Sequence, residues 1–402
     1  MKKFVFVMVL VGLTMLFGLV SVVRASTPGV LTIWADEKRA PILGPLAEDF
    51  EAAYGIPVVV HEIVFGELKT KYLVAAPAGE GPDILVGAHD WVGELAAGGL
   101  LAPIHLKAEE LKLFSPVGIE AFSWGGELYG FPYIMEAVAL FYNKDLIAEP
   151  PTTFEELIAV AKGLTDRKAG EYGFLWDAAN FYFTFPLLSA GGGYVFAMKD
   201  GALDPTDIGL ANEGAIAGGE LLLHLVEEGI IFPGVDYGTM AGLFTAGNCA
   251  MVINGPWFIS DVRDAGINYG IAKIPTIEGN APRPFVGVHG LMINGLSENL
   301  VIANEFLKSF VFTKGVQLEI WRADRRIPTF MPAFEDPEVV ADPDTMAIGA
   351  SAADGIPMPN IPEMGAVWAA MGPALGHIIN QTLSPAEALA NAVAEIKAAI
   401  GE

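Results

Sequence analysis

Apolar residues in the first quarter of the chain alternate between short runs rich in β-formers and longer stretches at helical spacing. Leu46, Phe50 and Ala53 repeat at helical spacing, and Gly55 stands where a helix C-cap belongs. Strands that alternate with helices, punctuated by Gly and Pro, predict a parallel or mixed sheet covered on both faces. We therefore expect an α/β protein. The predicted elements of this region are, in order, 30–34, 41–54, 56–64, 67–76, 83–86 and 91–97.

Two helices further along the chain have recognisable starts. Thr153 and Glu156 form a capping box, and Ser384-Pro385-Ala386-Glu387 combines an N-cap, a Pro at the first helical position and a Glu at the third. The second of these helices runs to about Ile400. We also predict a helix at 216–226 and a strand at 250–253. No internal repeat or low-complexity linker is visible, so we expect interleaved lobes joined by ordered crossings.

The first 25 residues have the features of a secretory signal peptide. Lys2 and Lys3 precede an apolar run at 4–23, and Val23-Arg24-Ala25 places small or apolar residues at the two positions that a signal peptidase reads. We expect cleavage after Ala25 and an exported, soluble protein in the periplasm or another extracytoplasmic space. An uncleaved membrane anchor is the alternative, because about 20 apolar residues can span a bilayer.

Composition narrows the class of protein. The chain has 402 residues, enough for two to three domains, and 52% are apolar against 18% charged, which excludes intrinsic disorder. Cys249 is the single cysteine, so no disulfide framework exists. The formal charge is -25 and the basic residues never form a cluster. Nucleic acid and anionic membrane surfaces are therefore excluded as partners.

Motifs for common enzyme chemistry are absent. The chain has no HExxH, GxSxG, GxxxxGK[ST] or strand-associated GxGxxG motif. Its six histidines show no metal-ligand spacing, so we expect no metal and no cofactor. A glycosidase pair of carboxylates stays open at this point, because spacing alone does not reveal the one raised and one ordinary pKa that such a pair needs.

Aromatic side chains stand next to polar ones at several predicted strand ends and loops. A sugar ring offers an apolar face that stacks on an aromatic ring, and hydroxyls that need carboxylate, amide or cationic partners. These pairs suit sugar binding, and ordinary core and rim packing is the alternative. They are Asp90 with Trp91, Tyr133 with Glu136, Asn180 with Tyr182, Trp257 after Asn254-Gly255-Pro256, and Trp368 after the Pro-rich segment 357–362.

The same segments resemble the extracellular solute-binding proteins of the maltose, maltodextrin and trehalose type, the soluble receptors of ABC importers. The matching stretches are collinear and cover most of the mature chain. They are LTIWADEK (31–38), GPDILVGAHD (81–90), LYGFPYIMEAVALFYNKDL (128–146), YFTFPLLSAGGGYVF (182–196), AMVINGPW (250–257), INYG (267–270), RPFVGV (283–288) and MPNIPEM with Trp368 (358–368).

The resemblance implies a two-lobed, type II periplasmic-binding-protein fold, with mixed sheets flanked by helices and three hinge crossings. It divides the chain into a signal peptide (1–25), an N-terminal lobe (26–135 and 285–333) and a C-terminal lobe (136–284 and 334–402). The third crossing is expected near 328–337. The hinge residues that the resemblance implies are Glu136, Ala137, Val138, Pro284, Phe285 and Val286.

The resemblance also implies a ligand site between the lobes. Asp36, Glu37 and Lys38 match the first polar loop, Asp90 a hydroxyl-binding aspartate and Glu136 the hinge-side glutamate. Tyr182, Trp257 and Trp368 match aromatic platforms of the C-terminal lobe, and Trp91 and Asn180 complete the expected contacts.

Several of these positions depart from the maltose type. Gly87 stands where that type has a Trp, Trp91 where it has an Arg, and Asn180 where it has a Glu. Ala369 and Gly372 replace an aromatic residue and an Arg. These positions contact ligand in the family, so we expect the fold to be kept and the preferred sugar to differ, with trehalose or a bulkier ligand as candidates.

The leading interpretation is a monomeric receptor that binds a gluco-oligosaccharide and delivers it to membrane permease subunits without making or breaking a bond. A receptor for a cationic solute such as a polyamine is one alternative, because Asp36, Glu37, Asp90 and Glu136 are expected to converge on one cleft. Lys38, in the same loop, argues against it. An exported glycosidase is the other alternative.

Overall fold

The structure is a computed structural model that describes residues 29–402. Two β-sheets organise this part of the chain. The predicted signal peptide lies outside these residues. The first sheet has seven strands in the order β14-β6-β13-β3-β1-β2, with β15 beside β13. It is mixed: β1 pairs in parallel with β2 and β3, and β13 is antiparallel to β3 and β6. Its strands are β1 (Leu31–Ala35), β2 (Val58–Glu62), β3 (Ile84–Ala88), β6 (Phe131–Glu136), β13 (Phe285–Ile293), β14 (Ile327–Pro328) and β15 (Ile356–Pro357).

The second sheet has four strands in the order β12-β7-β11-β8. It is also mixed, because β7 is antiparallel to β11 and β12 while β11 and β8 are parallel. Its strands are β7 (Ala139–Asn143), β8 (Tyr172–Leu175), β11 (Cys249–Asn254) and β12 (Tyr269–Ala272). Two small hairpins are formed by β4 (Ser123–Trp124) with β5 (Glu127–Leu128) and by β9 (Phe196–Lys199) with β10 (Ala202–Ile208).

Helices cover the first sheet to form the N-terminal lobe. The sequence prediction for α1 is confirmed, since the helix ends at Tyr54 and Gly55 caps it with φ of +68°, a left-handed conformation that glycine adopts without strain. The helices of this lobe are α1 (Ala40–Tyr54), α2 (Phe65–Ala75), η1 (His89–Trp91), α3 (Val92–Ala97), α4 (Ala108–Leu111), α5 (Pro116–Ala121), α11 (Leu300–Phe306), the π-helical η3 (Leu307–Val311), α12 (Lys314–Asp324), α13 (Met331–Phe334) and α14 (Pro337–Val340).

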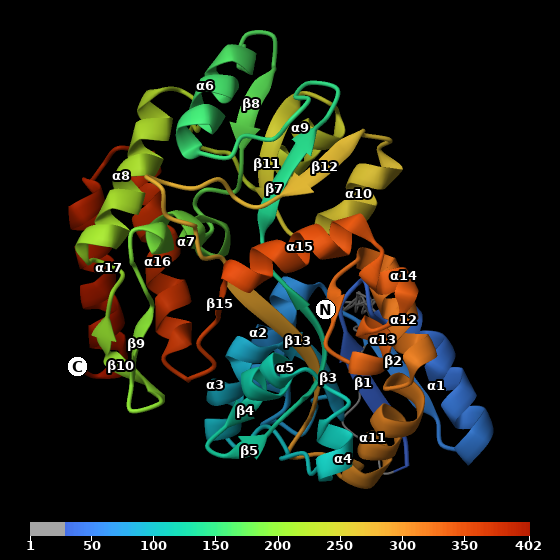
Figure 1. Ribbon diagram of the computed structural model, residues 1–402. Helices are drawn as coiled ribbons and strands as arrows, with labels where there is room; N and C mark the ends of the chain where they lie inside the picture. The colour runs from blue at the N-terminus through green and yellow to red at the C-terminus, as the bar shows by residue number, and fades with distance from the viewer. Residues whose placement is uncertain (1–28) are drawn as a thin grey trace, which may run out of the picture.

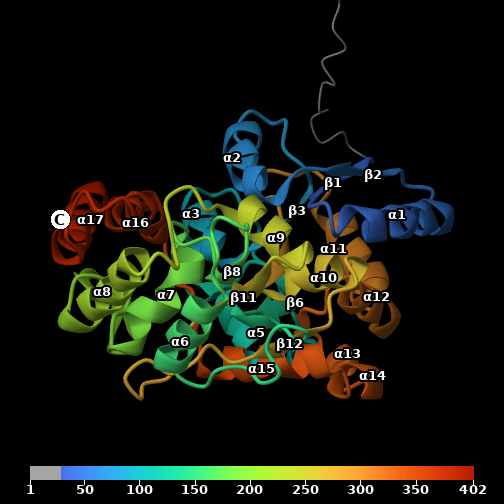
Figure 2. The ribbon, with the colours of Figure 1, turned by 90° about the horizontal axis from the view of Figure 1, so that it is seen from above.

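A second group of helices completes the C-terminal lobe. The capping boxes predicted at Thr153 and Ser384 are both present, at the starts of α6 and α17. Helices α8, α16 and α17 pack side by side at the opposite end of the molecule from α1 (Figures 1 and 2). The helices are α6 (Phe154–Leu164), α7 (Phe181–Ala190), α8 (Glu213–Glu227), α9 (Tyr237–Thr245), η2 (Pro256–Phe258), α10 (Ile259–Asp264), α15 (Pro343–Asp354), α16 (Met364–Ile379) and α17 (Pro385–Ile400).

Each lobe has its own hydrophobic core. Every residue of β1, β3 and β13 is buried, and the same is true of β7 and β11. Strands without an exposed face need cover on both sides, which confirms the predicted α/β architecture. Cys249 lies in the C-terminal core, where burial raises the pKa of its thiol to about 12. Within residues 29–402, no helix combines the length and apolar character that a membrane crossing requires.

Three passages connect the lobes within residues 29–402, apart from the short strand β15, which returns to pair with the start of β13. It leaves the first sheet at Glu136 and enters the second at Ala139, and it returns to the first sheet at Phe285. Val339 packs in the N-terminal core and Ile348 in the C-terminal core, so the third passage lies between them, after the segment 328–337. Helix α15 lies between the two sheets (Figure 1).

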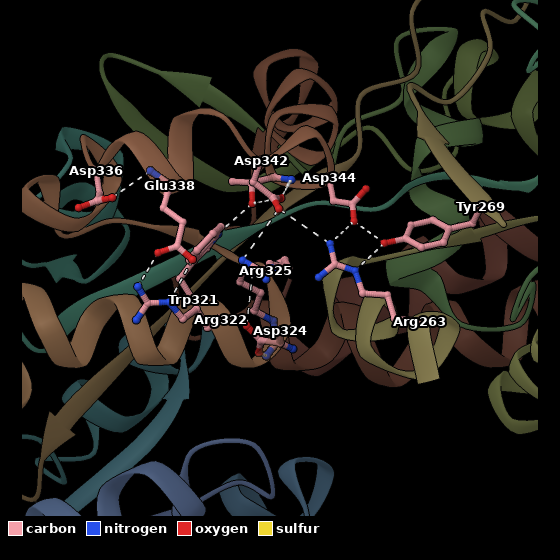
Figure 3. Close-up of polar contacts among 12 residues, drawn as sticks. Arg263, Tyr269, Trp321, Arg322, Asp324, Arg325, Asp336, Glu338, Asp342 and Asp344 are labelled. Atoms are coloured by element: carbon pink, nitrogen blue, oxygen red, sulfur yellow. Dashed lines mark hydrogen bonds and ion pairs between the residues drawn. The ribbon is translucent and has the colours of Figure 1, made fainter. Parts of the chain in front are cut away.

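Polar contacts tie the start of α15 to both lobes (Figure 3). Asp344 accepts a hydrogen bond from Arg263 Nη2 of α10 at 2.7 Å and another from the Tyr269 hydroxyl of β12. On the other side, Trp321 Nε1 of α12 donates to Thr345 Oγ1 at 2.9 Å, and Arg325 Nη1 lies 3.9 Å from Asp342 Oδ2. The third passage is therefore an ordered, polar connection, in contrast to a free linker.

Candidate functional site

A cavity of about 510 Å³ lies between the lobes. This volume is in the range of small-molecule sites. All ten residues predicted as ligand contacts line it: Asp36, Glu37, Lys38, Asp90, Trp91, Glu136, Asn180, Tyr182, Trp257 and Trp368. Eight lining residues were not predicted: Phe65, Ala88, Phe183, Tyr237, Asp261, His289, Arg326 and Met358.

The first polar loop connects β1 to α1, and hydrogen bonds fix the side chains of its three polar residues. Asp36 Oδ1 accepts hydrogen bonds from the backbone N–H groups of Lys38 at 2.8 Å and Arg39 at 3.2 Å. Glu37 Oε2 accepts one from the N–H of Phe65 at the start of α2. Lys38 Nζ donates to Ser260 Oγ of α10 at 3.2 Å, so this loop reaches across to the C-terminal lobe.

Buried ion pairs form part of the cavity wall and continue behind it. Arg39 Nη1 lies 2.8 Å from Asp324 Oδ2, and Arg326 pairs with Asp324 and with Glu136. His289 Nε2 lies 3.3 Å from the other Glu136 oxygen. The opposite charges in this row compensate one another. Removing one partner would leave a buried charge unpaired, at a cost of about 3 to 5 kcal/mol in stability.

These pairs keep two cavity carboxylates ionised. Burial alone would raise the pKa of Glu136, but Arg326 and His289 outweigh it and lower that pKa to about 2. Burial likewise opposes ionisation of Asp36, and the guanidinium groups of Arg39 and Arg326 together with the Lys38 N–H lower its pKa below the ordinary value. Asp36 and Glu136 therefore remain negatively charged at neutral pH.

Three rings pack together in the N-terminal wall of the cavity. The centroid of the Phe65 ring lies 5.4 Å from that of Trp91 and 4.9 Å from that of His289, with the ring planes close to parallel in both pairs. A Cβ atom at Gly87 would lie 2.5 Å from ring carbons of Trp91, so the indole packs directly on the glycine backbone. A side chain at residue 87 would occupy the space of the indole, so the glycine makes room for the Trp91 ring.

Trp257 forms the C-terminal wall in a similar way. A Cβ atom at Gly255 would lie 2.1 Å from its ring, and the Tyr182 ring packs 6.1 Å away. The Arg326 guanidinium of the N-terminal lobe stands 5.6 Å from the centroid of the Trp257 ring, a cation–π distance across the cleft. The Tyr182 hydroxyl is buried beside the backbone of Gly287 in the N-terminal lobe.

Trp368 of α16 also meets the opposite lobe. Its Nε1 donates to Asp90 Oδ2 at 3.0 Å, while its ring packs against Phe181 and Phe285. Together with the bond from Lys38 to Ser260, this contact joins the two lobes around the cavity. The arrangement is that of a closed cleft.

The Asn180 side chain, in contrast, serves as the N-cap of helix α7. Its Oδ1 caps α7 by accepting from the Tyr182 N–H at 3.1 Å, and its Nδ2 lies 3.3 Å from Asp177 Oδ2. The side chain lines the cavity, but its best acceptor is already used.

The sequence analysis did not identify three residues whose contacts shape the cavity wall, namely Phe65, His289 and Arg326. They come from the start of α2, the middle of β13 and the turn after α12. No spacing or motif connects three positions so distant along the chain, so only the fold reveals that they meet. The adjacency of Arg325 and Arg326 to a predicted crossing was the one available signal.

Comparison with known proteins agrees with this architecture. Residues 45–347 match the family described as bacterial extracellular solute-binding protein. The galactooligosaccharide-binding protein of Bacillus subtilis is 31% identical over 92% of this chain and 89% of its own. The maltotriose-binding protein of Pyrococcus abyssi is 34% identical, with 87% and 78% covered. A maltooligosaccharide ABC transporter solute-binding lipoprotein of Streptococcus pneumoniae is 32% identical, with 84% and 81% covered. The chain belongs to the bacterial extracellular solute-binding proteins.

Proposed function

We propose that this protein is the substrate-binding component of a carbohydrate ABC transporter, and that it takes a short neutral oligosaccharide of the maltose, maltodextrin or trehalose type into the cavity between its lobes. The observation that carries the proposal is the pairing of aromatic walls. Trp91 and Phe65 face the cavity from one lobe and Trp257 and Trp368 from the other. Rings on both sides suit the two apolar faces of a sugar, and the polar groups between them suit its hydroxyls.

The charge pattern favours a neutral ligand over a polyamine. Two of the four carboxylates that motivated the cationic alternative, Asp36 and Glu136, are paired with buried arginines. Asp90 accepts from Trp368 Nε1. An ammonium group would therefore have to share Glu136 with Arg326 and Asp90 with Trp368, and the cations Lys38 and Arg326 line the same space.

A glycosidase is also disfavoured by the same carboxylates. Glycoside hydrolysis needs one carboxyl group that is protonated at working pH and donates its proton to the leaving group. Asp36 and Glu136 have lowered pKa values, so neither is suited to that role. The three relatives compared above are named as binding proteins. We propose that the sugar is bound and released unchanged.

In this proposal the lobes open and close about the passages between them. Glu136, Ala137 and Val138 bend at the first passage, Pro284, Phe285 and Val286 at the second, and the segment 339–348 at the third. We propose that the protein binds its ligand as a monomer, with both lobes of one chain lining the cavity. The protein works outside the cytoplasm after its leader is cleaved near Ala25, and the closed form docks on the permease subunits.

Calorimetric titration of the mature protein tests the function. The probes are maltose, maltotriose, trehalose, sucrose, a galactooligosaccharide and spermidine, each at low and at high salt. We expect at least one sugar to bind with an affinity that changes little with salt, because a neutral ligand is not screened. If spermidine binds tightly and its affinity falls steeply as salt rises, the protein is a polyamine receptor and the proposed sugar-binding function is wrong. Incubation with maltodextrin should release no smaller sugars.

A further inference from the structure

One carboxylate of the cavity lining has no partner within the part of the chain that the structure describes. Five carboxylate side chains of residues 29–402 line the cavity. Four of them accept hydrogen bonds from other groups of the protein: Asp36, Glu37, Asp90 and Glu136. The fifth, Asp261 of helix α10, is an exposed residue whose carboxylate makes no hydrogen bond or ion pair with residues 29–402. Neither the sequence pattern nor the family resemblance assigns it a role.

Helix geometry places Asp261 on the cavity side of α10. The 3-10 helix η2 continues into α10 without a break, because Phe258 and Ile259 at the join both have right-handed helical backbone angles. Residues four positions apart in a helix share a face. Trp257, four positions before Asp261, lines the cavity, while Phe258, Ile259 and Val262 are buried in the C-terminal core. The carboxylate and the indole therefore lie on one face, turned away from that core.

A second helix supports this placement. Tyr237, the first residue of α9, is half-buried and also lines the cavity. Burial is the main cause that raises the pKa of Tyr237, and the negative charge of Asp261 raises that pKa further. Such an effect requires the two side chains to be near each other. Tyr237, Trp257 and Asp261 therefore form one corner of the cavity, with an aromatic platform beside a free carboxylate.

Lys38 of the opposite lobe brings hydrogen-bond donors to the same corner. Its Nζ donates to Ser260 Oγ at 3.2 Å, and Ser260 is the residue next to Asp261. An ammonium group has three donors, so Lys38 keeps two for other partners. A hydroxyl is both a donor and an acceptor, so one that lies between these residues donates to the carboxylate and accepts from the ammonium. The positive charge of Lys38 also makes this corner less favourable for a cationic ligand than for a neutral one.

We propose that Asp261 accepts hydrogen bonds from hydroxyl groups of the sugar ring that stacks on Trp257. The inference rests on the proposed function, since it requires a neutral ligand with hydroxyl groups. It makes Asp261 a specificity-determining residue of the C-terminal lobe, because a sugar without the hydroxyl at this corner loses a charge-assisted hydrogen bond.

Two substitutions at Asp261 test the contact. Asp261→Ala removes the acceptor, and Asp261→Asn keeps an oxygen acceptor of the same size without the charge. The probes are maltose, trehalose, their singly deoxygenated forms and spermidine, titrated by calorimetry into the wild-type protein and both variants. We expect Asp261→Ala to bind the tighter-binding parent sugar about 10-fold more weakly, the lower end of the scale for a hydrogen bond to a charged group, because the residue is exposed. Asp261→Asn should recover part of this loss.

Asp264→Ala is the matched control. It removes the same charge from the last residue of α10, at an exposed position that does not line the cavity, and it should bind the sugar as the wild type does. An equal loss of affinity in Asp264→Ala would show that the effect is general electrostatics and would overturn the inference. The same conclusion follows if Asp261→Ala weakens the binding of spermidine and leaves that of the sugars unchanged.

The deoxy sugars form a double-mutant cycle between protein and ligand. One deoxy form should bind the wild type more weakly than its parent sugar, and Asp261→Ala should bind that form as well as it binds the parent. Unchanged sugar affinity in Asp261→Ala, or equal losses for every deoxy form in both proteins, overturns the inference and leaves the proposed function standing. If a thermal scan shows that Asp261→Ala does not fold, the cycle is run with Asp261→Asn, which should show a smaller penalty at the same hydroxyl. A wild-type protein that binds no sugar overturns the proposed function and this inference with it.

Discussion

At the scale of single residues, the cavity depends on glycines that make room for large rings. Trp91 lies on Gly87 and Trp257 on Gly255, one pair in each lobe. The resemblance alone presents Gly87 as the loss of an aromatic platform, and the structure places the Trp91 ring directly against this glycine. Position-by-position matching could not reveal this contact, because the two positions are four residues apart and are related only through packing.

Trp257→Ala tests the opposite wall. We expect the variant to fold and to bind the ligand more weakly by about 1 to 3 kcal/mol, the scale for removing a buried aromatic contact from an interface. Calorimetry with the best sugar measures the change, and a thermal scan checks the fold. Phe183→Leu, which alters a neighbouring ring in the same wall, is the matched control and should have a smaller effect. Unchanged affinity in folded Trp257→Ala would make this ring a packing residue.

Glu136 links the site to the pH dependence of stability. Its pKa falls from an ordinary 4.5 to about 2 in the folded protein, so the folded state gains stability above pH 4.5 that is lost as the pH falls through 2. The full shift corresponds to roughly 3 kcal/mol. We expect Glu136→Gln to be less stable than the wild type at pH 7, and the difference to shrink between pH 4.5 and pH 2. Urea unfolding across this range measures it, and a difference that does not change with pH would contradict the assignment.

At the scale of elements, hydrophobic periodicity and end signals identified the regular parts of both lobes. The predicted strands and helices of residues 30–97 correspond to β1, α1, β2, α2, β3 and α3, and both capping boxes are formed. The third passage was harder to predict. Its segment turns through the short helices α13 and α14 before α15, and short helices held by tertiary contacts leave little periodic signal.

The start of α15 offers an element-scale prediction. Asp342 caps this helix by accepting from the Thr345 N–H at 2.8 Å, and it also approaches Arg263 and Arg325. Asp342→Ala should lower the free energy of unfolding by about 1 kcal/mol, the usual cost of a lost N-cap. Asp342→Ser keeps an acceptor and removes the charge, so it should recover most of the stability. If the two variants lose equal stability, then the ion pairs of Asp342 stabilise this helix start and its N-cap hydrogen bond does not. Urea denaturation distinguishes the cases.

At the scale of the whole molecule, the family resemblance led to the fold and to the ten expected lining residues, and the structure added the connections between them. Resemblance transfers positions one at a time. It does not transfer couplings such as the one that joins Arg326, Glu136 and His289, because these depend on side chains that the fold brings together from three distant segments.

Closure is the prediction that belongs to this scale. Trp368 meets Asp90 and Lys38 meets Ser260 only when the lobes are together, so a ligand that bridges the lobes should favour the closed form. Small-angle X-ray scattering should give a smaller radius of gyration with saturating sugar than without. Sucrose or another sugar that calorimetry shows not to bind serves as the control. Tight binding with no change in radius would exclude hinge closure.

The burial of Cys249 has a practical consequence. The chain contains one cysteine, it is fully buried in β11, and its raised pKa keeps the thiol protonated at neutral pH. Thiolate is the reactive form, so maleimide reagents should leave this position untouched in the folded protein. A second cysteine introduced at an exposed position on the rim of the cleft would then be labelled selectively, without first replacing the native one. An environment-sensitive fluorophore attached there would turn the closing of the lobes into an optical signal, and the protein into a reagentless sensor for its own ligand.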